Sequence, residues 1–496
     1  MKKLKYLILL ILIIPIMASA EAVHLTQADI EEAYANIGVD IERTQLRFVL
    51  RNSCPGFYMS GEEYILDEDI DLHQGFFAPT GQKLVINLNG HDIKNELPLY
   101  ENGFTYSVIR DIGEAVDITI NGPGKLYTEL EYVEFGVNIH GGVLNLNNLE
   151  LIGSIRGASE HGDCVINLNN VTMTGRFQLW NSSTINIDNS TLNSKLYNSA
   201  LSGYAYINNT TINYIGEFSG NGLEFKDDSE YGSEYIPSKG IIKNSKISGK
   251  NAALWLEKNC EVTVENTELI GLQYAALYVI ENPKLTMSDV YLHNEGSVND
   301  YQVISGYVDN DNVVDYFNQF VKEGYIYWKD PEYKNGDTYS SSNKGMQNHN
   351  LWIIKQQQEY ENEDNTYVIP EDNEIIIKVS GYKVLLEDIM INGEVVPNTN
   401  YEILDSDDNE VIIKLSSDYL KTLEANEYDV EVVFVNGSSK SKLTIQDAEV
   451  KNEEETPVIV VNPKTALKSY TYLLVIAIIA GITAIIIGKK SYFKSK

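Results

Sequence analysis

The chain has 496 residues, of which 43% are hydrophobic and 22% charged, and this composition excludes a wholly disordered or fibrous protein. Acidic residues outnumber basic ones by 71 to 38, so the net charge is −33. A surface this acidic repels nucleic acid, and we expect no nucleic-acid partner. The three cysteines provide no disulfide framework.

Residues 1–20 have the pattern of a secretory signal peptide. Lysines near the start precede an apolar run, and Ala18-Ser19-Ala20 gives the small-x-small cleavage pattern. We therefore expect signal peptidase to cut here and the mature chain to be exported. Residues 21–63 are predicted to form an N-terminal cap, in which Leu25 to Tyr34 has helical spacing with Thr26 as N-cap.

A short phrase recurs seven times between Val143 and Leu292: an apolar pair, an Asn- or Asp-centred turn, and another apolar residue. The turn residues are Asn148, Asn170, Asn189, Asn209, Asn244, Asn266 and Asp289. Two positions earlier stand Leu146, Leu168, Ile187, Ile207, Ile242, Val264 and Met287. Three positions later stand Leu151, Met173, Leu192, Ile212, Ile247, Leu269 and Leu292.

The spacing of the turn residues, 19 to 35 residues, is too short for a propeller blade and lacks the helices of helical solenoids. The repeat therefore predicts one coil of a parallel β-helix, in which Asn accepts the left-handed conformation and hydrogen-bonds to its stacked neighbour. A leucine-rich repeat, the nearest alternative, needs more leucines and a helix in each unit. The longest interval contains a polar run, Lys226 to Lys239, that we interpret as an inserted loop.

The segment Val85 to Ile93, VINLNGHDI, resembles the opening coils of bacterial secreted and surface proteins of the pectin-lyase-like superfamily. With the seven copies, the resemblance covers residues 64–305 and implies an all-β fold, a right-handed parallel β-helix. Gly90 is predicted to occupy the turn slot, with Leu88 and Ile93 flanking it. The superfamily includes lyases, hydrolases, adhesins and phage spikes, so the resemblance does not fix the activity.

Candidate catalytic residues are few. The outward position before each turn is mixed and mostly neutral, so no column of carboxylates repeats there. Acid, base and cationic side chains gather in one loop-like stretch, and the weak catalytic candidates are Arg156, Glu160, His161 and Asp163. Asp227 and Asp228 offer oxygen ligands for Ca²⁺, although solvated loop acids are the plainer interpretation.

Aromatic side chains recur between the second turn of a coil and the next strand. Rings of this kind stack on sugar faces and also enrich protein-binding surfaces, although some are expected in the core. The candidate binding residues are Phe177, Trp180, Tyr197, Tyr204, Trp255 and Tyr278.

Beyond the repeats, residues 306–354 are predicted to cap the solenoid, with a helix over 312–323 and a loop-like closure over 325–354. Residues 355–374 are hydrophilic and predict a linker. Short strands between 375 and 447 resemble an Ig-like module of bacterial surface proteins, in the run that begins INGEVVPNTNYEIL and contains VIIKL and VVFVNG. Residues 448–461 predict a second linker.

The C-terminus predicts an anchor. Residues 470–488 carry no charge and are long enough to span a bilayer, and 489–496 form a basic cytoplasmic tail. The preceding segment, Asn462, Pro463, Lys464, Thr465 and Ala466, resembles the LPxTG and NPxTG motifs of sortase substrates, departing from them at its first and fifth positions. The resemblance implies that sortase joins Thr465 to the cell wall; a plain single-pass anchor is the alternative.

We expect a protein displayed on the bacterial surface whose solenoid is a non-catalytic binding or adhesive module for glycan or protein. The alternative is a tethered polysaccharide lyase or glycoside hydrolase of the same fold.

Overall fold

The computed structural model describes residues 22–447 apart from 52–53, 73–74, 82, 96–106, 129–134, 196–197, 228–236, 282, 297–301, 308–312, 330–337, 340–343, 347–349, 361–363, 370–374, 382 and 405–409. The predicted signal peptide, sorting motif, transmembrane helix and basic tail lie outside the described residues. Within the described ranges no helix is long and apolar enough to cross a membrane.

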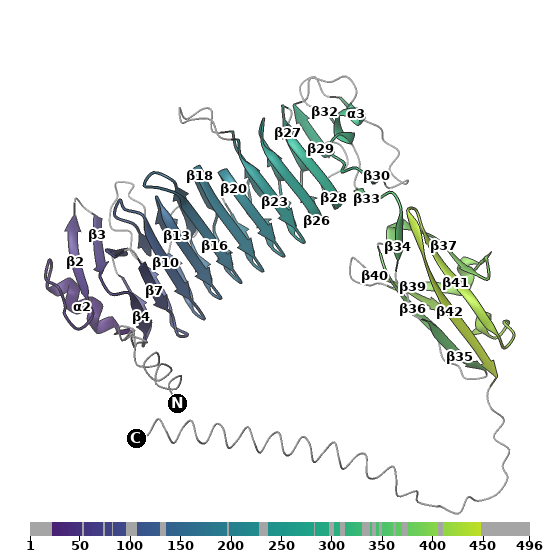
Figure 1. Cartoon of the computed structure of the whole chain (residues 1–496), viewed down its shortest axis with the longest axis horizontal. Coiled ribbons are helices and arrows are strands. Elements are labelled where there is room, and N and C mark those ends of the chain that lie inside the picture. The colour runs from purple at the N-terminus through teal and green to yellow at the C-terminus, as the bar shows by residue number, and fades with distance from the viewer. Residues whose placement is uncertain are drawn as a thin grey trace, which may run out of the picture.

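The larger part of the chain is a parallel β-solenoid of about nine turns, which forms the elongated body in Figure 1. A regular turn contributes strands to three parallel sheets. Sheet 1 contains β1 (Val23–Leu25), β4 (Glu63–Leu66), β7 (Lys83–Asn87), β10 (Val116–Asn121), β13 (Gly142–Asn147), β16 (Cys164–Asn169), the ends of β18 (Phe177–Asp188) and β20 (Ser199–Asn208), β23 (Lys239–Lys243), and the starts of β26 (Glu261–Gly271) and β28 (Lys284–Asn294).

Sheet 2 follows the Asn corner. It contains β5 (Ile70–Asp71), β8 (Ile93–Asn95), β11 (Lys125–Thr128), β14 (Glu150–Ile152), β17 (Thr172–Thr174), β19 (Thr191–Ser194), β21 (Thr211–Tyr214), β24 (Lys246–Gly249) and the ends of β26 and β28.

Sheet 3 completes the coil. It contains β3 (Cys54–Met59), which pairs antiparallel with β2 (Leu46–Arg51), then β6 (Phe76–Pro79), β9 (Ile109–Arg110), β12 (Phe135–Ile139), β15 (Ser154–Ala158), the starts of β18 and β20, β22 (Leu223–Phe225), β25 (Ala252–Leu256), β27 (Ala275–Ile280) and β29 (Gln302–Tyr307).

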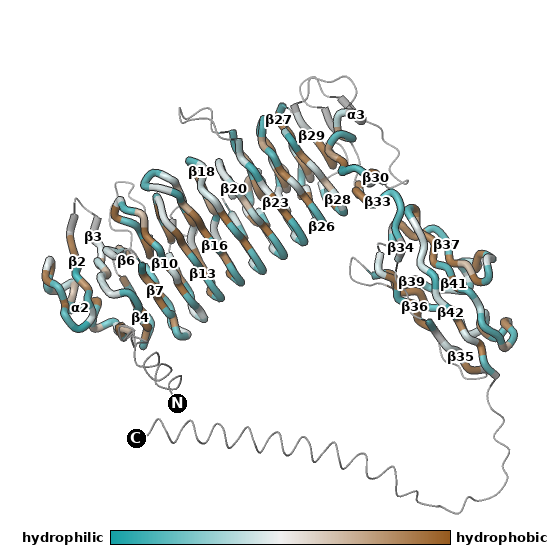
Figure 2. Tube along the Cα trace, viewed as in Figure 1, coloured by the Kyte–Doolittle hydropathy of each residue, from teal (hydrophilic) through white to brown (hydrophobic). Residues whose placement is uncertain are grey.

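The repeat positions form the core. Polar and apolar residues alternate along the strands in Figure 2, as expected where one face of each strand is buried. All seven residues two positions before the turn are 0 or 1% exposed and lie in register, from Leu146 to Met287. The predicted interior column is therefore confirmed.

The Asn corner also follows the prediction. The seven turn residues have φ between +45° and +56°, and the side chain of Asn170 donates to that of Asn148 at 2.9 Å. One assignment is wrong. Ile86 pairs with Ile120, which pairs with Leu146, so Ile86 and not Leu88 lies in register with the residues two positions before the turn. Gly90 therefore does not occupy the regular turn slot. The corner before Ile93 is wider, and the buried Leu88 lies within it.

Both ends of the solenoid are closed. The predicted N-terminal helix is α2 (Gln27–Ala35), where the Thr26 backbone N–H donates to the Asp29 carboxylate at 2.7 Å. The predicted C-terminal helix is shorter, α3 (Val313–Asn318). The loop-like closure predicted over 325–354 is wrong, because β30 (Tyr325–Lys329) and β33 (Asn350–Lys355) pair antiparallel with each other and β33 pairs with β28; β31 (Thr338–Tyr339) and β32 (Lys344–Met346) also pair.

A second unit with two smaller sheets, largely antiparallel, follows the solenoid. One sheet contains β34 (Gln358–Tyr360), β35 (Asn365–Ile369), β37 (Leu386–Ile391), β38 (Glu394–Val395), β41 (Glu427–Phe434) and β42 (Gly437–Asp447). The other contains β36 (Ile375–Ser380), β39 (Tyr401–Leu404) and β40 (Glu410–Leu415), and three short helices are η2 (Lys383–Leu385), η3 (Asn398–Asn400) and α4 (Ser417–Leu420). The linker predicted over 355–374 is wrong, since β34 and β35 pair with β42 in this segment.

Candidate functional site

The outward faces of sheets 1 and 2 largely consist of side chains that satisfy one another. In sheet 1, Asn186 donates to Asn167 at 2.7 Å and Asn167 donates to Asn145 at 2.8 Å. Further along, Lys243 pairs with Glu265 at 2.8 Å, and on sheet 2 the next pair, Lys246 and Glu268, lies at 2.7 Å. These repeated pairs hold adjacent coils together and leave little chemistry for a ligand.

Sheet 3 differs, because its central outward column changes residue type at almost every coil. Along each strand, the residue that belongs to this column is followed by a residue that points into the core, such as Leu179 or Leu201. The column contains Arg110, Asn138, Arg156, Gln178, Ala200, Glu224, Trp255, Tyr278 and Ser305. At about 4.8 Å per coil it is about 38 Å long, which is the length of an extended polymer segment.

An aspartate–histidine pair stands at the N-terminal end of sheet 3. The Asp111 carboxylate, 2% exposed, lies 3.2 Å from His140 Nδ1 and also accepts a hydrogen bond from the His140 backbone N–H. Burial alone would raise the pKa of Asp111, but the hydrogen bonds from His140 outweigh it and lower that pKa. In the neutral tautomer whose Nδ1–H donates to this carboxylate, Nε2 is a hydrogen-bond acceptor.

Cationic and aromatic side chains lie beside this pair. The Arg156 guanidinium lies 4.6 Å from the centre of the Trp180 ring, a cation–π distance. Burial lowers the pKa of Arg156; nearby Glu160 opposes this shift, and Arg110 adds to it. The His161 ring centre lies 6.3 Å from that of His140. Asn138 stands between the two arginines in register, and its buried Oδ1 accepts no hydrogen bond.

A second charged group lies four coils beyond β12, around Glu224. Glu224 is nearly buried, and its carboxylate accepts from Asn198 Nδ2 at 2.8 Å and faces Lys226 Nζ at 3.4 Å. The carboxylate of Asp227 faces Lys258 Nζ at 3.7 Å. These contacts hold two carboxylates in fixed positions at the end of β22.

Glu257 joins this group from the next coil. The Asp227 backbone N–H donates to Glu257 Oε2 at 2.7 Å. Burial raises the pKa of Glu257, and the negative charges of Glu224 and Asp227 add to this effect. The hydrogen bond from Asp227 and the charge of Lys226 lower the pKa, but they are outweighed. The Trp255 ring, adjacent to Glu224 in register, stacks on Tyr278 with ring centres 4.0 Å apart and planes 13° apart.

The predicted catalytic candidates are placed at one end of this face. Arg156 lies in the column, whereas Glu160, His161 and Asp163 are exposed on the turn that leads from sheet 3 to sheet 1. Asp227 belongs to the second group, and Asp228 lies outside the described residues. In the described part of the chain no three His, Cys, Asp or Glu side chains are placed to hold a metal ion.

The predicted aromatic residues do not form one line. Phe177 is fully buried in the core, so its assignment as a binding residue is wrong. Trp180, Trp255 and Tyr278 lie on sheet 3, while Tyr204 is 39% exposed on sheet 1. Tyr197 lies outside the described residues.

Sequence reasoning misses Asp111, His140, Glu224 and Glu257. They come from different coils, and the chain between sheets 2 and 3 varies in length, so no fixed spacing relates them. The available signal is local: in β22 the buried Leu223 and Phe225 flank Glu224 and direct it outward.

Comparisons with known proteins identify no relative. No protein-family model matches the chain, and no curated protein matches it. Seven chains of solved structures show a partial likeness, among them three from titin. "Titin kinase and its flanking domains" has 12% identity and a TM-score of 0.15, covering 23% of this chain and 20% of that one, so the chain spans about a fifth of its length. "M1 domain from titin" has 15% identity and a TM-score of 0.13, covering 18% and 94%. "I-band fragment I67-I69 from titin" has 10% identity and a TM-score of 0.13, covering 25% and 54%. At these TM-scores the likeness carries no argument about fold or function.

Proposed function

We propose that the chain is an exported bacterial protein, anchored at its C-terminus, whose right-handed, pectin-lyase-like solenoid binds a glycan along sheet 3 without cleaving it. The observation that carries the proposal is the outward column of sheet 3. Its residue type changes at almost every coil, whereas sheet 1 keeps ladders such as Asn145, Asn167 and Asn186, and neighbouring residues hold the side chains of the column in place. In this proposal, Ig-like packing in the second unit holds the solenoid off the surface.

The chemistry of the column favours a polysaccharide. Charged and amide side chains suit sugar hydroxyls, and Trp180 and Trp255 offer apolar ring surface to sugar C–H groups. Because Asn198 and Lys226 hold Glu224 and Tyr278 holds Trp255, little side-chain freedom is lost when a ligand binds. An extended ligand following the column contacts both charged groups.

An oligosaccharide array probed with the full chain tests this proposal. We expect Arg156→Ala and Trp255→Ala each to weaken binding about tenfold or more, equivalent to about 1.4 kcal/mol. Tyr206→Ala is the matched control, because Tyr206 is 43% exposed on sheet 1. The proposal fails if no glycan binds, or if Tyr206→Ala weakens binding as much as Trp255→Ala while all variants keep their circular-dichroism spectra.

A second candidate function, glycoside hydrolysis, is favoured by Glu257, whose pKa is raised by burial and, less, by the nearby charge of Glu224. A carboxyl with a raised pKa beside an ion-paired carboxylate is the arrangement that glycosidases use as acid and base. In this alternative Glu257 gives its proton to the bridging oxygen as the C–O bond breaks. Glu224 takes a proton from the water that attacks the anomeric carbon.

Release of reducing ends from a bound polysaccharide tests the alternative. We expect Glu257→Gln to lower kcat by at least about a hundredfold. Because the acid acts in its protonated form, wild-type activity falls as pH rises through the Glu257 pKa, which lies above the ordinary glutamate range. Glu261→Gln, on sheet 1, is the control. Binding with no release by the wild type leaves only the non-catalytic function.

A further inference from the structure

We propose that the second unit, residues 358–447, is the C-terminal cap of the solenoid and is locked to it in one orientation through Asn436. It is therefore an integral end of the solenoid and no freely tethered spacer.

The first observation is that β33 is buried on both faces. Leu351 and Ile353, each 1% exposed, belong to the solenoid core. Trp352 and Ile354, 4% and 5% exposed, belong to the core of the second unit. Because side chains alternate across a strand, β33 separates the two cores and is shared by them.

Aromatic residues of the solenoid extend this contact. The Tyr291 ring stacks on Trp352 with ring centres 4.8 Å apart, and Trp328 lies 5.1 Å from Trp352. Tyr291 and Trp328 both pack against the core of the second unit. Without that unit, two tryptophans, a tyrosine and an isoleucine would form an apolar patch at the end of the solenoid. A solenoid cap that faces solvent has a polar outer surface, and the outer face of β33 is apolar.

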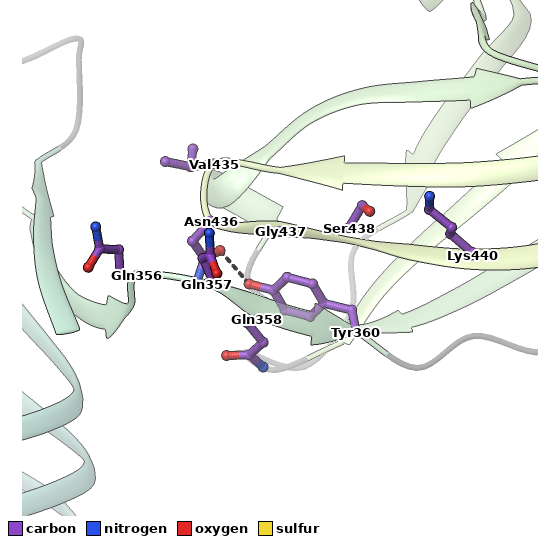
Figure 3. A pocket seen from close by; sticks show the side chains of 9 residues that line it. All are labelled: Gln356, Gln357, Gln358, Tyr360, Val435, Asn436, Gly437, Ser438 and Lys440. Atoms are coloured by element: carbon purple, nitrogen blue, oxygen red, sulfur yellow. Dashed lines mark hydrogen bonds between the residues drawn. The ribbon is translucent and has the colours of Figure 1, made fainter. Parts of the chain in front are cut away.

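The second observation is a hydrogen-bonded joint immediately after β33. Two residues, Gln356 and Gln357, connect β33 to β34. Asn436, 5% exposed, lies beside this connection in Figure 3. Its Nδ2 donates to the Lys355 carbonyl at 2.9 Å, and its Oδ1 accepts from the Tyr360 hydroxyl at 2.6 Å. One side chain thus binds the last residue of the solenoid and the first strand of the second unit.

The backbone around Asn436 tightens the same joint. The Gln358 N–H donates to the Asn436 carbonyl at 2.8 Å. At Gly437 a Cβ would lie 1.7 Å from the Gln358 carbonyl oxygen, so only glycine allows this approach. The ring centres of Tyr360 and Phe434 lie 4.2 Å apart. This packing fixes the Tyr360 hydroxyl that donates a hydrogen bond to Asn436.

Two cavities border the joint. A groove of about 970 Å³, shown in Figure 3, and a smaller one of about 290 Å³ share Gln358, Tyr360 and Asn436 as lining residues. The Asn436 side chain therefore adds a hydrogen-bonded link across residues 356–358 to the apolar packing of β33. Loss of this one side chain is expected to loosen the joint and widen the range of orientations between the two units.

Spin-label distance measurement on the full chain tests the lock. Labels are attached at Thr172→Cys and Lys378→Cys, two exposed positions, in a background with Cys54→Ser; Cys164 and Cys260 are buried. We expect one narrow distance distribution in the wild type and at least a twofold broader one in Asn436→Ala. Asn392→Ala is the matched control, since Asn392 accepts the Asp429 N–H at 2.8 Å away from the joint, and it should leave the width unchanged.

Calorimetry of the same proteins tests the cap. We expect the wild type to unfold in one transition and Asn436→Ala to show a separate transition of the second unit at lower temperature. Two independent transitions in the wild type would contradict the cap. A broad wild-type distance distribution, or an unchanged width in Asn436→Ala, would contradict the lock.

Discussion

The corner asparagines show how a single residue type determines the path of the chain. Between sheets 1 and 2 the backbone must turn a corner within a few residues, and the seven turn residues adopt positive φ there. Asn accepts this conformation more readily than other residues with a Cβ, and its amide bonds to the Asn of a neighbouring coil, as Asn209 does to Asn189 at 2.6 Å. The first property is local and the second recurs at the spacing of the repeat, which is why the sequence alone predicts both.

Substitution at Asn170 tests this account. Asn170 has a φ of +54° and donates to Asn148. We expect Asn170→Ala to lower the free energy of unfolding by about 1 to 3 kcal/mol, since alanine loses the hydrogen bond and is strained at positive φ. Asn170→Gly keeps the conformation and should cost less. Urea unfolding measures both variants, and an alanine variant more stable than the glycine variant would contradict the interpretation.

Site residues are harder to predict at this scale. Arg156 and His161 stand out in the sequence because they lie close together in a polar stretch. His140 and Asp111 meet only because consecutive coils place β9 and β12 side by side. Asp227 and Glu257 are brought together in the same way, by the pairing of β22 with β25. A contact between coils depends on the register of the paired strands. On sheet 3 the strands follow connections of unequal length, so the sequence does not reveal their register.

At the scale of elements, sheets 1 and 2 are predictable and sheet 3 is not. Strands on either side of the Asn corner keep a constant spacing to it, so their apolar residues align by eye. β34 could not be predicted from the sequence for another reason. Gln358 and Glu359 are polar, and the strand lies at the edge of its sheet. An edge strand with polar side chains has the composition of a linker.

Truncation of a core residue tests the interior column. Leu168 is 1% exposed and pairs in register with Leu146 and Ile187. We expect Leu168→Ala to cost about 2 to 5 kcal/mol, because it leaves a cavity between stacked coils. Val165→Ala, which changes a half-buried outward residue of the same strand, should cost about 1 kcal/mol or less. Equal costs for the two variants in denaturant unfolding would place Leu168 outside the core.

At the scale of the whole molecule, the second unit follows the C-terminal end of the solenoid, and the N-terminal cap lies at the opposite end (Figure 1). If the proposed anchor follows residue 447, the second unit lies nearest the cell and the N-terminal cap farthest from it. In that arrangement, sheet 3 lies along the side of the solenoid, between the second unit and the N-terminal cap. The fixed joint at Asn436 would keep that face in one orientation relative to the second unit.

Extraction of the protein from cells tests the anchor itself. If sortase joins Thr465 to the wall, detergent alone should release little protein from intact cells, and wall digestion should release most of it, because a covalent bond to the wall resists detergent. Thr465→Ala removes the residue that would be joined, so this variant should become extractable by detergent through its apolar segment, 470–488. Lys464→Ala, at the variable position of the motif, is the matched control and should behave like the wild type. Complete release of the wild type by detergent would leave the apolar segment as a plain membrane anchor.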